Sequence, residues 1–83
     1  MPIRVVIVDD HAIVRAGMRM LLQSDPEIAI VGEGESGADA LALARTHQPD
    51  VILMDVSMPG IDGVEATQRI KQENPGTAVL AVT

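Results

Sequence analysis

The sequence contains two short aliphatic runs that end in aspartate, Arg4-Val-Val-Ile-Val-Asp-Asp10 and Val51-Ile-Leu-Met-Asp55. Neither run alternates apolar with polar residues, so both are typical of strands that are buried on both faces. Strands of this kind belong to parallel sheets whose faces are covered by helices. The two runs therefore predict the α/β class.

The residues around these runs have the spacing of helices and turns. Apolar residues recur every three or four positions from Ala12 to Leu22, and Pro26 predicts that this helix stops before it. Gly32, Gly34 and Gly37 indicate a loop. The predicted strands are residues 4–8, 28–31, 51–54 and 77–83, and the predicted helices are residues 12–23, 38–46 and 63–73. This alternation favours successive right-handed strand–helix–strand units on one parallel sheet.

The composition predicts one small domain with an aliphatic core. Eighty-three residues are too few for two domains, and 47% of them are hydrophobic although Phe, Tyr and Trp are absent. There is no cysteine, which excludes a disulfide and a zinc–thiolate site. No apolar stretch is long enough for a signal peptide or a membrane span. We therefore expect a soluble, cytoplasmic protein that does not contact the membrane.

The net charge of −6 has the wrong sign for a chain that neutralises phosphate groups. Direct binding of nucleic acid by these residues is therefore not expected.

Three carboxylates follow the two buried runs. Asp9 and Asp10 end the first run, and Asp55 ends the second. The carboxyl ends of parallel strands meet at one edge of a sheet, so the three negative charges converge there if the two strands are neighbours. Their repulsion calls for a cation, and oxygen ligands with no histidine or cysteine ligand nearby favour Mg²⁺. The sequence thus predicts a Mg²⁺ site at this edge.

Each aspartate has a simpler interpretation when it is taken alone, because aspartate is a common helix N-cap. Three such residues after two buried strands make that interpretation weaker. We interpret His11 as a residue at the start of a helix rather than a ligand, and His47 as a residue suited to a helix C-terminus. Lys71 is expected to face solvent from the middle of its helix.

The motifs also resemble those of a known family. Val8-Asp-Asp-His11, Leu53-Met-Asp-Val-Ser-Met-Pro-Gly-Ile-Asp-Gly63 and the terminal Thr83 resemble receiver domains of two-component response regulators. The stretch Asp10-His-Ala-Ile-Val-Arg-Ala-Gly17 is similar to the NarL/FixJ subgroup. The resemblance implies that residues 1–83 form a flavodoxin-like receiver domain with strand order 2-1-3-4 and helices on both faces. It also implies an incomplete C-terminus, without the fifth strand and the last helices.

The same resemblance implies a role for each site residue. Asp55 resembles the phosphoacceptor, which takes a phosphoryl group from a sensor histidine kinase. Asp10, Asp55 and the backbone carbonyl of Ser57 resemble the direct Mg²⁺ ligands, with Asp9 acting through a water. Thr83 resembles the hydroxyl residue that couples phosphorylation to a switch surface, although a plain strand-end threonine is the alternative. Such a domain assists only its own phosphoryl transfer and dephosphorylation, so it is not expected to be an enzyme.

Three functions follow as hypotheses. The first is a phosphorylation-controlled switch that normally regulates transcription through an attached DNA-binding output domain, which is absent here together with the phosphate-contacting lysine of the family. The second is a dimerising fragment that cannot be phosphorylated, since the last apolar run would be an unpaired edge that favours a homodimer or a strand-exchanged oligomer. The third is a Mg²⁺-dependent phosphatase, which would require an aspartate where Ser57 stands.

Overall fold

The chain alternates strands with helices along its whole described length. The computed structural model describes residues 2–55 and 63–82. Its elements are β1 (Ile3–Val8), α1 (Ala12–Gln23), β2 (Ile28–Gly34), α2 (Gly37–His47), β3 (Val51–Asp55), α3 (Gly63–Glu73) and β4 (Ala78–Val82). The α/β class and the order of the elements predicted from the sequence are confirmed. Among the described residues no helix has both the length and the apolar composition that crossing a membrane requires.

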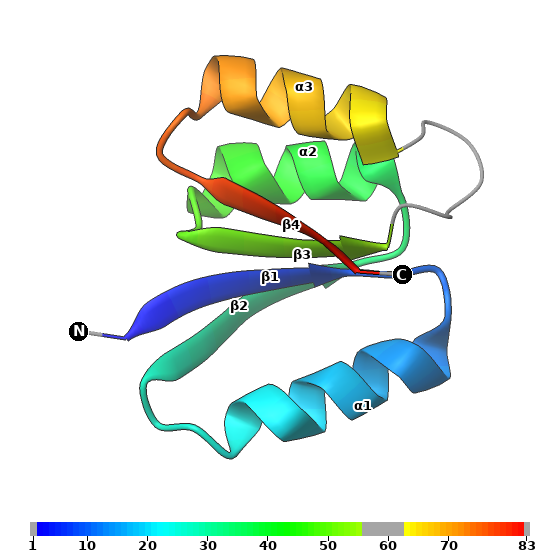
Figure 1. Ribbon diagram of the computed structural model, residues 1–83, viewed down its shortest axis with the longest axis vertical. Coiled ribbons are helices and arrows are strands. Elements are labelled where there is room, and N and C mark those ends of the chain that lie inside the picture. The colour runs from blue at the N-terminus through cyan, green and yellow to red at the C-terminus, as the bar shows by residue number, and fades with distance from the viewer. Residues whose placement is uncertain (1, 56–62, 83) are drawn as a thin grey trace.

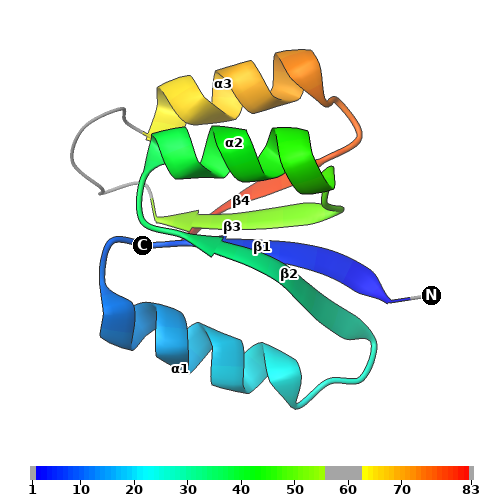
Figure 2. The ribbon, with the colours of Figure 1, turned by 180° about the vertical axis from the view of Figure 1, so that it is seen from behind.

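The four strands form one parallel sheet in the order β2-β1-β3-β4. Helix α1 lies on one face of the sheet, and α2 and α3 lie side by side on the other, as Figure 1 and the reverse view in Figure 2 show. The flavodoxin-like order predicted for the sheet is therefore confirmed. The strand order reverses between β1 and β3, and this is where open α/β sheets bind ligands.

The core is aliphatic and lies under α2 and α3. Its buried side chains come from the two central strands and from one face of each of these two helices: Val6, Val8, Ala40, Leu41, Ala44, Ile52, Met54, Ala66 and Ile70. Helix α1, by contrast, has no fully buried residue. The side of the sheet that carries α2 and α3 is thus the better packed one, and it fixes the two central strands against each other.

One part of the sequence interpretation is wrong. Gly32 and Gly34 were predicted to lie in a loop, but β2 continues through both of them. A Cβ atom at residue 32 would lie 2.9 Å from the Leu43 side chain, and one at residue 34 would lie 2.7 Å from Cβ of Asp39. These glycines therefore let α2 pack closely on the end of β2, which is a second reason for glycine besides a turn.

Helices α2 and α3 are tied together by a paired interaction at their surface. The guanidinium of Arg45 donates from Nε and Nη2 to the two carboxylate oxygens of Glu73, at 2.6 and 2.7 Å. These hydrogen bonds lower the pKa of the Glu73 carboxyl and raise that of Arg45. The ionised pair belongs to the folded state, so its contribution to stability depends on pH.

We expect the free energy of unfolding of Glu73→Gln to fall less between neutral and acid pH than that of the parent chain. Because folding lowers the pKa of Glu73, the pair stabilises fully above about pH 5 and is lost as the pH falls through the folded pKa. Urea unfolding followed by circular dichroism at about pH 7 and about pH 4 measures this difference. Glu27→Gln, which changes another exposed glutamate, is the control, and equal acid sensitivity of Glu73→Gln and the parent chain would contradict the expectation.

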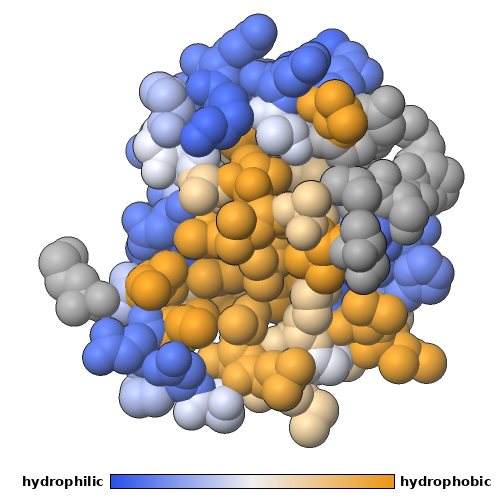
Figure 3. Space-filling view, viewed as in Figure 1, coloured by the Kyte–Doolittle hydropathy of each residue, from blue (hydrophilic) through white to orange (hydrophobic). Residues whose placement is uncertain are grey.

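The face of the sheet that carries α1 is incompletely covered. Val79 of β4 packs against the core, so Leu80, the next residue, points to the opposite face, where it is 52% exposed. Ile13, Met20 and Leu21 of α1 are also exposed, and Figure 3 shows the resulting apolar area over the strands and α1. Within the described sheet, β4 pairs only with β3 and carries neither a charge nor a proline. An edge of this kind favours pairing with another chain.

The expected self-association through β4 is tested by Leu80→Lys. A lysine at this position places a charge on the open edge, which should weaken association by about tenfold or more, since a buried leucine contributes roughly 1.5 to 3 kcal/mol. Ala42→Lys adds the same charge to the exposed side of α2 and is the matched control. Sedimentation velocity over a concentration series gives the answer, and a parent chain that stays monomeric throughout would rule the association out.

Candidate metal-binding site

The carboxyl ends of β1 and β3 bring the predicted carboxylates together. The two strands are parallel neighbours with Val8 opposite Met54, so the residues that follow lie side by side at one edge. Oxygen atoms of Asp9, Asp10 and Asp55 and a ring nitrogen of His11 all lie within 4.8 Å of one another. The convergence expected from the sequence is therefore present in the structure.

Asp9 is the most constrained member of this group. Its side chain is buried, and its backbone N–H donates to the carbonyl of Gly34 at the end of β2, at 3.1 Å. Its Oδ1 accepts a hydrogen bond from the backbone N–H of His11 at 2.8 Å, as aspartate does in an Asx turn. Asp9 is thus held to β2 by its backbone and to the start of α1 by its side chain.

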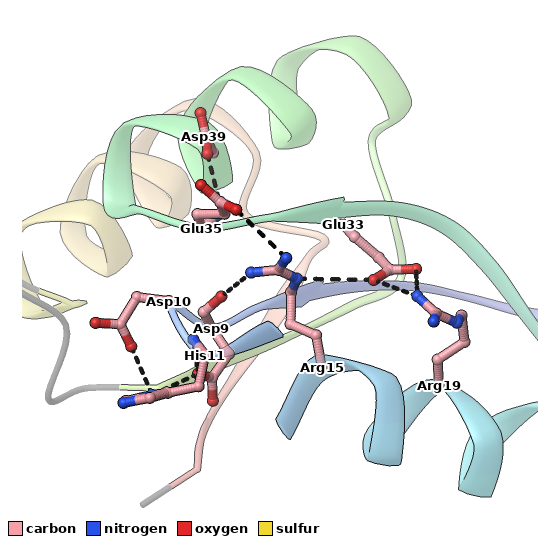
Figure 4. A network of polar contacts seen from close by, with 8 residues as sticks. All are labelled: Asp9, Asp10, His11, Arg15, Arg19, Glu33, Glu35 and Asp39. Atoms are coloured by element: carbon pink, nitrogen blue, oxygen red, sulfur yellow. Dashed lines mark hydrogen bonds and ion pairs between the residues drawn. The ribbon is translucent and has the colours of Figure 1, made fainter. Parts of the chain in front are cut away.

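His11 lies at the N-cap of α1, as the sequence interpretation expected, but its ring also lies against the carboxylates. Nδ1 is 3.2 Å from Oδ1 of Asp9 and 2.9 Å from Oδ1 of Asp10, and most of the ring is exposed (Figure 4). This contact follows from the Asx turn, which folds the residue two positions after Asp9 back toward the carboxylate. The turn signal was therefore present in the sequence.

Asp55 ends β3 on the buried side of the group. Only 7% of it is exposed, because β1 and β4 flank β3 on both sides. A nearly buried carboxylate next to two others is costly unless a positive partner is present. Of the other residues predicted for the site, Ser57 and Thr83 lie outside the described residues, and so does the predicted N-cap Asp62.

The donor set fits a hard divalent cation. Carboxylate oxygens are the ligands that Mg²⁺ prefers, and Mg²⁺ usually keeps several waters and takes one or two carboxylates. The group is compact, with its ligand atoms within 4.8 Å of one another, so one divalent cation could contact more than one of these carboxylates.

A second group of charged residues lies next to the carboxylates and was missed by the sequence interpretation. Arg15 of α1 contacts Asp9 and two glutamates of β2 and its following loop, Glu33 and Glu35 (Figure 4). No role was predicted for Arg15 from the sequence. Helix side chains lean toward the N-terminus, so an arginine one turn into a helix can reach the loop before it.

A hollow of about 160 Å³ lies elsewhere, between α2 and α3. It is lined by Leu41, Ala44, Arg45, Gln48, Ile70, Glu73 and Asn74. None of these residues belongs to the carboxylate group. The described residues of the predicted site, Asp9, Asp10 and Asp55, thus lie outside this hollow.

Comparison with known proteins gives one consistent result. The sequence pattern of the response regulator receiver domain matches residues 5–83. The chain is 47% identical over all its residues to response regulator protein VraR of Staphylococcus saprophyticus, and 46% identical over 98% of them to response regulator GacA of Pseudomonas aeruginosa. It covers 40% and 38% of these relatives, so it spans about two fifths of their length.

Solved structures agree in fold and sequence. The signal receiver domain of the putative response regulator NarL from Mycobacterium tuberculosis superposes with a TM-score of 0.91 at 39% identity, covering 96% of this chain and 64% of that one. RcsB from Salmonella enterica, solved bound to promoter rprA with a phosphomimetic, gives 0.88 at 30% identity, covering 98% and 42%. The sequence similarity and the sheet geometry therefore both indicate a receiver domain of the kind found in response regulators.

Asp10→Asn should have opposite effects on stability with and without Mg²⁺. Without the cation, removal of one of three close negative charges should raise the free energy of unfolding by up to about 1 kcal/mol. With saturating Mg²⁺, the variant should lose most of the stabilisation that ligand binding gives the parent chain. Thermal unfolding with and without Mg²⁺ measures both effects, with Asp50→Asn at the other end of β3 as the control. An equal Mg²⁺ effect in parent and Asp10→Asn would contradict the assignment.

Proposed function

Because this chain belongs to the response regulator receiver domain family of two-component systems, we propose that it is a phosphorylation-controlled switch whose acceptor is Asp55. The observation that carries this proposal is the meeting of Asp9, Asp10 and Asp55 at the carboxyl ends of two adjacent strands. An aspartate beside a cation site can remain ionised and act as a nucleophile.

Asp55 carries out the covalent step. A carboxylate oxygen attacks the phosphorus atom of a phosphodonor, and the P–O bond to Asp55 forms as the bond to the leaving group breaks. With a phosphohistidine donor the broken bond is P–N, and the imidazole leaves with a proton from solvent. The product is an acyl phosphate, which water later hydrolyses. Since the transition state is loose, the protein contributes chiefly by positioning and by charge stabilisation.

The residues around Asp55 have supporting roles in this proposal. Asp10, Asp55 and the backbone carbonyl of Ser57 would hold Mg²⁺ directly, and Asp9 would hold it through a water. Bound Mg²⁺ neutralises the charge on the phosphoryl oxygens. Asp9 suits the indirect role, because its Oδ1 already accepts the His11 N–H. The hydroxyl of Thr83 would respond to the phosphoryl group and pass the change to the surface.

The relatives supply the expected partners. VraR, GacA and NarL are named as response regulators, and RcsB is described bound to promoter DNA. We infer a sensor histidine kinase as the phosphodonor, a cytoplasmic location, and control of transcription through an output domain outside these residues. The net charge of −6 is consistent with DNA contacts made by another domain. No turnover of an external substrate is proposed.

A dimerising role is the second candidate function. It is favoured by the open edge of β4 and the exposed apolar side chains near it. In this candidate the chain associates and is not phosphorylated, so it is an alternative to the first. Association without an added phosphoryl group would support it, and phosphorylation of the chain would exclude it.

Treatment with acetyl phosphate and Mg²⁺ tests the acceptor. We expect mass spectrometry of the intact chain to find one added phosphoryl group, which hydroxylamine removes because it cleaves acyl phosphates. The group should be absent from Asp55→Asn and present in Asp50→Asn, whose changed residue lies just before β3, away from the carboxylate edge. A phosphoryl group on Asp55→Asn, or none on the parent chain, would refute the assignment.

A further inference from the structure

Arg15 reaches from α1 back to the carboxylate edge. Its Nη1 donates a hydrogen bond to the backbone carbonyl of Asp9 at 2.6 Å, and only 15% of its side chain is exposed. Arginine is rarely buried to this extent unless it is paired. The contact links the end of β1 to the first turns of α1, so it fixes the loop that carries Asp9 and Asp10.

The guanidinium of Arg15 is itself oriented by a third element. Its Nη2 lies 3.4 Å from Oε1 of Glu35, and its Nε lies 3.8 Å from Oε1 of Glu33 (Figure 4). Glu33 also accepts two hydrogen bonds from Arg19, at 2.9 Å each. The planar fork of arginine is thus aimed at Asp9 by carboxylates on β2 and its following loop.

Asp9 is consequently fixed at three atoms. Its N–H is bound by the carbonyl of Gly34, its carbonyl by Arg15 and its Oδ1 by the N–H of His11. Two side chains therefore contact Asp9, since the ring Nδ1 of His11 also lies 3.2 Å from its Oδ1. Arg15 lies outside the carboxylate group, so its substitution can remove a contact with Asp9 while the possible ligands and the backbone pairing of β1 and β2 are kept.

Two effects of Arg15 on a bound cation oppose each other. A positive charge near the site repels a divalent cation, so its removal should tighten binding on Coulomb grounds alone. The contact with Asp9, by contrast, holds the carboxylates in place, so its removal should weaken binding. Glu33 and Glu35 already offset the charge of Arg15, whereas the hydrogen bond to Asp9 is direct.

We propose that Arg15 is a positioning residue that holds the Asp9–Asp10 loop in the geometry that binds the cation. The proposal rests on the function proposed above, because it requires that these carboxylates bind Mg²⁺. It predicts that substitution of Arg15 weakens Mg²⁺ binding, although the change makes the site more negative. The sign of the effect therefore separates positioning from electrostatics.

Isothermal titration of the 83-residue chain with Mg²⁺ alone tests the proposal. Arg15→Gln should raise Kd by about tenfold, as loss of an outer contact to a metal ligand commonly does. Arg19→Gln is the matched control, because it removes the same charge and a partner of Glu33 from the same helix without touching Asp9. Its Kd should stay within about twofold of the parent value, a difference too small to reflect loss of a ligand contact.

Stability without Mg²⁺ is the second measurement. Arg15→Gln loses the contacts with Glu33, Glu35 and the Asp9 carbonyl, whereas Arg19→Gln loses only those with Glu33. We therefore expect Arg15→Gln to unfold at a lower urea concentration than Arg19→Gln and still to be folded without urea, where Mg²⁺ binding is measured. If Arg15→Gln does not fold, Mg²⁺ binding is measured on Arg15→Lys instead. Lysine keeps the positive charge but lacks the planar guanidinium that donates to Asp9. Arg15→Lys should also bind Mg²⁺ several-fold more weakly than the parent chain.

The possible outcomes divide clearly. Weaker binding by the Arg15 variants, with Arg19→Gln unchanged, supports the proposal. Unchanged or tighter Mg²⁺ binding by Arg15→Gln overturns it. An equal loss of Mg²⁺ affinity in Arg19→Gln also overturns it. A parent chain that binds no Mg²⁺ overturns the proposed function and this inference with it, whereas failure of the inference alone leaves binding by the parent chain intact.

Discussion

The parallel pairing of β1 with β3 is the constraint on which the rest of the structure depends. It places the last residues of both strands at one edge, so that Asp9, Asp10 and Asp55 lie within a few ångströms of one another. The pairing is enforced by aliphatic burial, since Val6, Val8, Ile52 and Met54 have no exposed surface. Hydrophobic free energy thus holds together charges that would otherwise repel each other.

A rigid strand pair positions backbone atoms, but the loops after it need further support. At β1 that support comes from the neighbouring strand, from the start of α1 and from Arg15. The three contacts connect Asp9 with β2 and with α1. Asp9 is therefore held in place by the fold itself, and in the proposed function this would lower the entropic cost of binding a cation.

The failures of the sequence interpretation have physical causes. Gly32 and Gly34 were assigned to a loop because glycine usually marks a turn, but here it allows α2 to approach β2 closely. Arg15 was missed because its partners, Glu33 and Glu35, are distant in the sequence. His11 lies at the N-cap of α1 as expected, and the Asx turn of Asp9 also brings its ring to the carboxylates.

The alternation of strands and helices, the aliphatic core and the identity of the clustered aspartates were determined by the sequence itself. These features follow from the period of apolar residues and from which residues end a buried run, and both are local properties. Tertiary structure alone decided the distances among the carboxylates, the close packing of α2 on β2 and the contact of Arg15 with Asp9. Each of these depends on how separate elements pack, and no local pattern encodes the distance between two residues that meet only after folding.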